Sequence, residues 1–187
     1  MTADAGDAGA TARATAACTA TAERLTLAGV EAEHLAVLEP PRRVLLWTRP
    51  ARMREIGRVW RLGTLLLGTD GALYAAGRAT RAAERGRPGY QSLSREERRE
   101  IAAAALRGGF ASGAPVNFDA TEIPIEDPAA LAALAASGPD GGAELPLGLA
   151  DGEVRVRWRA GAPLAGAQTL AAFLSERAEL LRSPEPS

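Results

Sequence analysis

Lysine is absent from this 187-residue sequence, so all 22 of its Lys and Arg residues are arginines. The absence excludes nucleophiles of the Ser-x-x-Lys type and the phosphate-binding lysine of a Walker A loop. A GC-rich coding sequence, which favours Arg and Ala codons, accounts for the bias without any function. Arginine presents a planar fork of donors that binds carboxylates and phosphates in pairs. Arginines therefore indicate an anion site only where they cluster.

Cysteine and histidine occur once each, as Cys18 and His34. This scarcity excludes an internal disulfide, a cysteine-based zinc cluster and a histidine-rich metal site. A Ser-His-Asp or Cys-His arrangement would have to use His34, which we interpret as a surface or half-buried side chain. We interpret Cys18 as an inert thiol. The sequence predicts no catalytic residue, no bound metal and no cofactor.

Long apolar runs and a surplus of positive charge are also lacking. No run approaches the roughly 20 apolar residues that span a bilayer, and the N-terminus has no secretory signal pattern. We therefore expect a cytoplasmic protein without a transmembrane segment. The net charge of −1 disfavours general nucleic-acid binding. Aromatic residues make up only 4% of the chain, and an exposed patch of its three tryptophans would point to a homodimer.

The central feature that is present is an apolar ribbon over residues 58–78. Two apolar runs flank Gly68-Thr69-Asp70-Gly71, and Asp-Gly is a strong hairpin signal. Leu65, Leu66 and Leu67 place apolar side chains on both faces of the first strand, as in a strand that is covered on both sides. A second ribbon over 145–159 is expected to join the same sheet.

The remaining elements surround these ribbons. We expect a flexible tail over 1–20, a single α+β domain over 21–182 and a C-terminal tail over 183–187. Within the domain, the patterns predict a helix over 21–39, a strand over 42–48, a capped helix from Ser94 to about 107, edge strands over 114–118 and 121–125, a short helix from Pro128, and an amphipathic helix over 164–181. The predicted fold class is α+β, with a mostly antiparallel sheet or partly open barrel of about seven strands, flanking helices and a C-terminal helix.

Arginine clusters are the main functional lead. One predicted anion site combines Arg52 and Arg54 with the residues of a second loop, Arg81, Arg85 and Arg87. The two loops meet at one end of the sheet if the first strands form a meander. An alternative anion site is a ladder of arginines on one face of the second ribbon, Arg155, Arg157 and Arg159. That ladder also fits an ordinary solvent face of the sheet.

Carboxylates provide the competing hypothesis. Asp119, Glu122, Glu126 and Asp127 cluster around the two predicted edge strands and could act as an acid–base pair. Charged turn residues explain the same cluster. We therefore hold two hypotheses. The first is a non-enzymatic binding or scaffold domain for a protein partner or an anionic small ligand. The second is a carboxylate-dependent hydrolase or amidase.

Several segments resemble an uncharacterised set of proteins from high-GC Gram-positive bacteria, some of which are labelled glutaminase. The resemblance covers roughly residues 40–180 and is carried by 60–81, Gly89-Tyr-Gln-Ser92, 107–113 and Val116-Asn-Phe-Asp119. It implies no site residues, because these motifs are hairpin, cap and turn residues. About seven extended segments closed by a C-terminal helix are also similar to the pleckstrin-homology-like barrel, which implies a fold and not a function.

Overall fold

A computed structural model describes residues 2–44, 47–86, 93–136, 145–159 and 161–183 of the chain. The chain forms two compact units where the sequence predicts one domain. Unit 1 consists of residues 1–31, 60–75 and 121–187, and unit 2 consists of residues 32–59 and 76–120. The chain passes from one unit to the other several times, so neither unit is a continuous segment.

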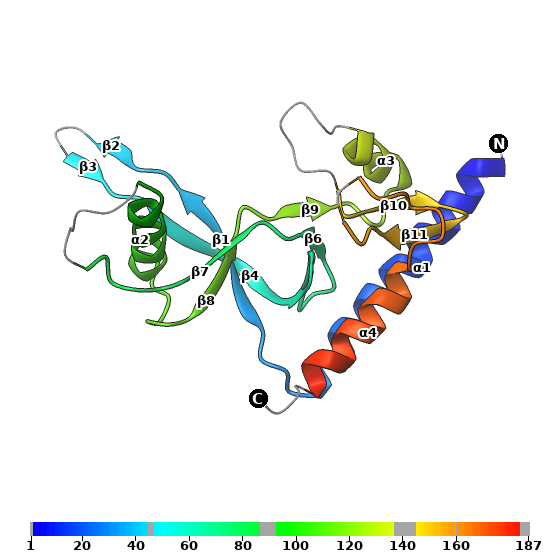
Figure 1. The fold of residues 1–187 in the computed structure, drawn as a ribbon, viewed down its shortest axis with the longest axis horizontal. Coiled ribbons are helices and arrows are strands. Elements are labelled where there is room, and N and C mark those ends of the chain that lie inside the picture. The colour runs from blue at the N-terminus through cyan, green and yellow to red at the C-terminus, as the bar shows by residue number, and fades with distance from the viewer. Residues whose placement is uncertain (1, 45–46, 87–92, 137–144, 160, 184–187) are drawn as a thin grey trace. The chain divides into compact units, whose positions relative to one another are not determined.

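The main sheet has seven strands in the order β7-β8-β1-β4-β5-β6-β9 (Figure 1). The pairs β1–β4, β5–β6, β6–β9 and β7–β8 are antiparallel, whereas β1 and β8 run parallel. The sheet is not closed, so the fold is the predicted α+β class in its open-sheet form and not a pleckstrin-homology-like barrel. The strands are β1 (Glu33–Glu39), β4 (Arg52–Leu62), β5 (Leu65–Gly68), β6 (Leu73–Ala75), β7 (Arg78–Arg81), β8 (Pro115–Phe118) and β9 (Thr121–Ile123).

The predicted hairpin over 58–78 is present in unit 1 as β5 and β6. Its turn is closed by the Asp70 carboxylate, which accepts a hydrogen bond from the Ala72 amide at 3.0 Å. Leu65, Leu66 and Leu67 are fully buried, as expected for a strand covered on both faces. A second tight turn, which the sequence analysis did not predict, separates β4 from β5 at Gly63, whose φ of 65° suits glycine.

The second ribbon does not join the main sheet. It forms a two-stranded sheet of its own in unit 1, with β10 at Leu147–Ala150 and β11 at Glu153–Val156. The other elements of unit 1 are helices: α1 (Thr2–Leu27), α3 (Pro128–Ala136) and α4 (Leu170–Arg182). Helices α1 and α4 lie side by side (Figure 1). Asp127 caps α3 and Thr169 caps α4.

The N-terminal prediction was wrong, because residues 2–27 form a helix and not a flexible tail. Small side chains at helical spacing, including Ala10, Ala14 and Cys18, are buried on one face of α1. The predicted helix over 21–39 was wrong in its second half. The helix ends just before Gly29, whose φ is 67°, and Glu33–Glu39 is strand β1.

Unit 2 packs helix α2 (Leu93–Arg107) against its strands. The core contains the buried side chains of Met53, Ile101, Val116 and Phe118. The expected strand over 42–48 is instead a separate small hairpin of β2 (Arg42–Val44) and β3 (Trp47–Arg49). Among the described residues, no helix combines the length and apolar composition that crossing a membrane would require.

Candidate functional site

The arginines predicted on the first loop are bound to a carboxylate of their own unit. Arg52 and Arg54 lie at the start of β4, opposite Glu39 at the end of β1. The Arg52 Nε donates to one Glu39 oxygen at 2.7 Å, and the Arg54 Nε donates to the other at 3.1 Å. The hydrogen bond from Arg52, assisted by Arg54, holds the pKa of Glu39 below its usual value. The single Glu39 charge therefore balances one of the two guanidinium charges and engages the Nε of each arginine.

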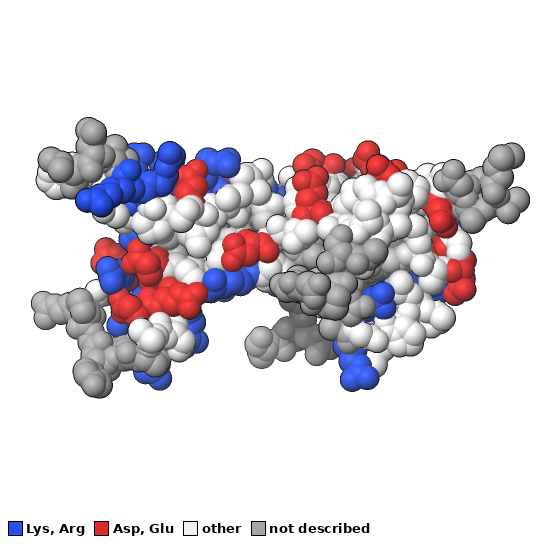
Figure 2. Space-filling model, turned by 90° about the horizontal axis from the view of Figure 1, so that it is seen from above, with Lys and Arg blue, Asp and Glu red and all other residues white. Residues whose placement is uncertain are grey.

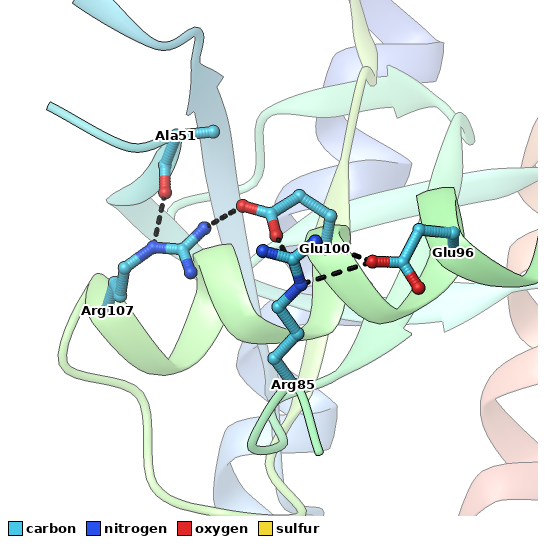
Figure 3. A network of polar contacts seen from close by, with 5 residues as sticks. All are labelled: Ala51, Arg85, Glu96, Glu100 and Arg107. Carbon is cyan, nitrogen blue, oxygen red and sulfur yellow. Dashed lines mark hydrogen bonds and ion pairs between the residues drawn. The ribbon is translucent and has the colours of Figure 1, made fainter. Parts of the chain in front are cut away.

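The arginines predicted on the second loop are also occupied. Arg81 donates to the Gly113 carbonyl at 3.1 Å. Arg85 donates to the Glu96 carboxylate of α2 at 2.6 and 3.2 Å, and it lies 3.4 Å from Glu100 (Figure 3). The hydrogen bond and charge of Glu96, with the charge of Glu100, raise the pKa of Arg85. The fifth residue of the predicted set, Arg87, lies outside the described residues.

A series of polar contacts links the second loop to the start of the first, although the strands do not form the meander on which the predicted meeting of the loops depended. Glu100 contacts Arg85 and also accepts from Arg107, whose Nε donates to the Ala51 carbonyl at 2.7 Å (Figure 3). Ala51 directly precedes Arg52 in the chain. The predicted loops thus meet within unit 2, but the meeting point is an internal network of cations and carboxylates.

The alternative ladder of arginines is directed at backbone carbonyls. Arg155 donates to the Ala150 carbonyl at 3.3 Å and to the Ala167 carbonyl at 2.5 Å. Arg157 donates to the carbonyl of Ala162. Arg159 lies over the Trp158 ring, 4.4 Å from its centre. Arg155 and Arg157 therefore anchor the segment between β11 and α4.

The predicted carboxylates do not form a single site. Asp119 belongs to unit 2, where it lies 3.8 Å from Arg78. The other three predicted carboxylates line a cleft of about 400 Å³ in unit 1, together with Asp70 and two threonines of α1. The Asp127 carboxylate is used as the cap of α3, and the Asp70 carboxylate is used in its own turn. No group of three or more His, Cys, Asp or Glu side chains within the described ranges is arranged to hold a metal.

Neither His34 nor Cys18 forms a nucleophile–base pair with another described residue. The His34 Nδ1 is 2.6 Å from a Glu55 oxygen, and the ring meets Phe110 edge-on with centroids 4.8 Å apart. Arg58 lies within 3.5 Å of the same ring. Cys18 is fully buried, and burial raises the pKa of its thiol to about 12. A thiol with this pKa is protonated at neutral pH and is a poor nucleophile.

The basic hairpin, which we define as Arg42, Arg43, Trp47 and Arg49 of β2 and β3, has a different environment. All four side chains are exposed, and Trp47 is 80% exposed. In the structure as described, the three arginines form no hydrogen bond, ion pair or ring contact with another described residue. Figure 2 shows positive side chains gathered at the end of unit 2 that carries this hairpin. The hairpin therefore carries three exposed arginines that have no carboxylate partner among the described residues.

The register of the hairpin places like charges opposite each other. Arg42 is paired with Arg49, and Arg43 is paired with Thr48. Like charges that face each other across two strands destabilise the pair. An isolated two-stranded hairpin is also only marginally stable in water. A bound anion would relieve the repulsion and order both strands, so the arrangement favours an anionic ligand.

The sequence analysis missed this site because it interpreted Arg42–Thr48 as one strand of the main sheet. The available signal was the symmetry of the segment: arginines lie on both sides of a short apolar run, and no acidic residue lies between positions 40 and 54. Neither predicted anion site includes Arg42, Arg43 or Arg49.

Comparison of the chain with protein-family models, with curated protein sequences and with solved structures finds no match. Function must therefore be inferred from the side chains themselves. The strongest feature for this purpose is the basic hairpin.

Proposed function

We propose that this protein is a non-enzymatic binding module whose basic hairpin holds an acidic segment of a protein partner. The single observation that carries the proposal is the exposed pairing of Arg42 with Arg49 beside Trp47, without a carboxylate partner among the described residues. Guanidinium groups bind carboxylates with two parallel hydrogen bonds, and an exposed tryptophan adds a large apolar contact. Both residue types are enriched at the centres of protein interfaces.

A protein partner fits the surroundings of the hairpin better than a nucleic acid does. Glu39 lies on β1 just before the hairpin, and Glu55 lies on β4 just after it. These carboxylates would repel a continuous phosphate backbone, whereas a protein segment of mixed charge can place its own cations beside them. The whole chain carries a net charge of −1 and so lacks the basic surplus of a general nucleic-acid binder.

The test measures binding of a fluorescein-labelled peptide of twelve glutamates by fluorescence anisotropy at low salt. We expect the double variant Arg42→Glu/Arg49→Glu to weaken binding at least about tenfold, because it replaces two charge-assisted contacts with repulsion. The matched control is Arg95→Glu/Arg99→Glu on α2, which changes the net charge by the same amount. We expect the control to bind within about twofold of the natural protein, apart from the long-range effect of charge.

Three results would overturn the proposal. Absence of binding between the natural protein and the peptide would show that the hairpin is not a carboxylate site. Equal weakening by both double variants would show that only net charge matters. Binding of an oligothymidylate of 15 nucleotides without binding of the glutamate peptide would assign the hairpin to nucleic acid.

A further inference from the structure

A second candidate site lies in unit 1, in a cavity of about 230 Å³ that the proposed function does not use. Its wall combines two aromatic rings, Trp158 and Phe173, with two guanidinium groups, Arg157 and Arg177. Trp158 follows β11, and the other aromatic residue and Arg177 lie one turn apart on α4. The Gly63 turn between β4 and β5 closes another side, where the glycine lies against the Phe173 ring.

The guanidinium group of Arg177 in this cavity has an incomplete environment. It lies over the Phe173 ring, 5.4 Å from the ring centre. Its Nε is buried and has no hydrogen-bond partner in the part of the chain that the structure describes. Buried donors are almost always satisfied, and a charged donor without a partner is costly. An acceptor that enters the cavity and reaches the Arg177 guanidinium would remove part of that cost.

Two other polar side chains of the cavity, Arg157 and Gln168, have hydrogen-bond partners. Arg157 donates to the Ala162 carbonyl. The amide nitrogen of Gln168 donates to Glu176 at 3.0 Å. Arg177 is therefore the cation most available to an incoming anion, and the surrounding rings favour a flat apolar group.

We propose that this cavity binds a small carboxylate that carries one aromatic ring. The ring would lie between Trp158 and Phe173, and the carboxylate would accept hydrogen bonds from Arg177. The volume matches this class, because a cavity of about 150 Å³ holds one benzene ring and drug-sized ligands need about 300 Å³ or more. The site is in a different unit from the basic hairpin and does not depend on the proposed function.

The probe is 4-fluorophenylacetate, and its neutral analogue is 4-fluorophenylacetamide. Binding to the full-length protein is followed by the ¹⁹F linewidth of each compound and by the indole N–H signals in a ¹⁵N correlation spectrum. We expect the acid to bind at least about tenfold more tightly than the amide, because only the acid forms a charge-assisted hydrogen bond with Arg177. We expect the Trp158 signal to shift, and the signal of the buried Trp60 to stay in place.

Variants assign the binding to Arg177. Arg177→Met keeps an unbranched stem but removes the guanidinium group, so it should weaken acid binding about tenfold or more while leaving amide binding nearly unchanged. Arg182→Met is the matched control on the same helix, since Arg182 pairs with Glu179 and does not line the cavity. Arg177→Lys retains the charge and keeps the test valid if the methionine variant does not fold. Its affinity for the acid should lie between the affinities of the natural protein for the acid and for the amide.

The proposal is overturned if acid and amide bind equally, or if Arg177→Met and Arg182→Met bind the acid alike. It is also overturned if the acid shifts the Trp47 signal and not the Trp158 signal, because the anion would then be held by the basic hairpin. Failure of the glutamate peptide to bind the hairpin would not affect this result, so the two proposals can fail separately.

Discussion

Individual arginine side chains in this protein differ chiefly in what neutralises them. Arg52 and Arg54 share the Glu39 carboxylate, while Arg42 and Arg49 face each other. A guanidinium group that already binds a carboxylate has little to gain from a second anion, since both donors and charge are used. The number and spacing of arginines in the sequence therefore did not show which arginines lack a carboxylate partner. The carboxylates that bind Arg52, Arg54 and Arg85 come from other elements of the fold.

Cys18 allows a prediction at the scale of one residue. Burial raises the pKa of its thiol from 9.0 to about 12, so at any pH below 9 it holds about a thousandfold less thiolate than an ordinary thiol. We expect the native protein to react with Ellman's reagent at pH 8 at least about a hundredfold more slowly than the protein in 6 M guanidinium chloride. Absorbance at 412 nm measures both rates, and Cys18→Ser gives the background.

Equal rates in the two conditions would show that Cys18 is accessible and that the packing around α1 does not bury it.

The raised pKa of Cys18 also makes the free energy of unfolding depend on pH, with a known sign. Between pH 9 and pH 12 the unfolded chain releases the thiol proton and the folded chain keeps it. The free energy of unfolding therefore falls as the pH rises through this range.

Among the elements, α1 departs most from what the sequence predicts. The prediction of a tail rested on the lack of large apolar side chains over residues 1–20. In the structure, small side chains suffice, because α1 packs closely against α4 and β11 and buries Ala10, Ala14 and Thr11. Arg13 adds an anchor by donating to the Gly152 carbonyl at 2.7 Å.

The close packing of α1 predicts that a larger side chain on its buried face is destabilising. Ala14→Leu should lower the free energy of unfolding by about 1–3 kcal/mol, because no space is available for the added methyl and methylene groups. Ala12→Leu is the matched control on the exposed side of the same helix, and it should be nearly neutral because both residues are good helix formers.

Urea unfolding followed by circular dichroism at 222 nm measures both variants. If the two leucine variants unfold at the same urea concentration, the buried face of α1 does not pack as the structure shows. If both are as stable as the natural protein, the helix contributes little to the stability of unit 1.

Elements specified by local chemistry were predictable from the sequence. Asp70-Gly71 gave the hairpin turn, and Asp127-Pro128 gave the start of α3. Elements that depend on distant packing were not predictable. Residues 33–39 contain a continuous apolar run over 35–38, which fits a buried helix segment as well as a strand, and only pairing with β4 and β8 makes them a strand. The cavity beside Arg177 likewise combines residues more than 90 positions apart.

Over the whole molecule, opposite charges nearly cancel while their local distribution is uneven. The chain has 22 arginines against 23 acidic residues, yet the basic hairpin contains no acidic residue. The two most exposed tryptophans each lie beside arginines, since Trp47 shares β3 with Arg49, and Trp158 contacts Arg159. A twofold contact through the hairpin would bring arginines of the two copies together.

This distribution predicts that the protein alone is a monomer. Light scattering coupled to size-exclusion chromatography at about 0.15 M salt should give the chain mass of 19.4 kDa. Arg42→Gln/Arg49→Gln serves as the comparison, because neutral side chains at both positions remove the repulsion that we expect to keep copies apart. Twice the chain mass for the natural protein would contradict the prediction and would make the exposed tryptophans a self-association surface.

The interleaved composition of the two units also bears on synthesis of the chain at the ribosome. The last residue needed for unit 2 is 120, whereas unit 1 needs α4, which ends at Arg182. Helix α1 emerges first and must wait for α4, its packing partner, through more than 140 residues of translation. Once residue 120 has emerged, unit 2 has all of its strands and can finish folding while α4 is still to be made. The order of emergence therefore favours completion of unit 2 before unit 1.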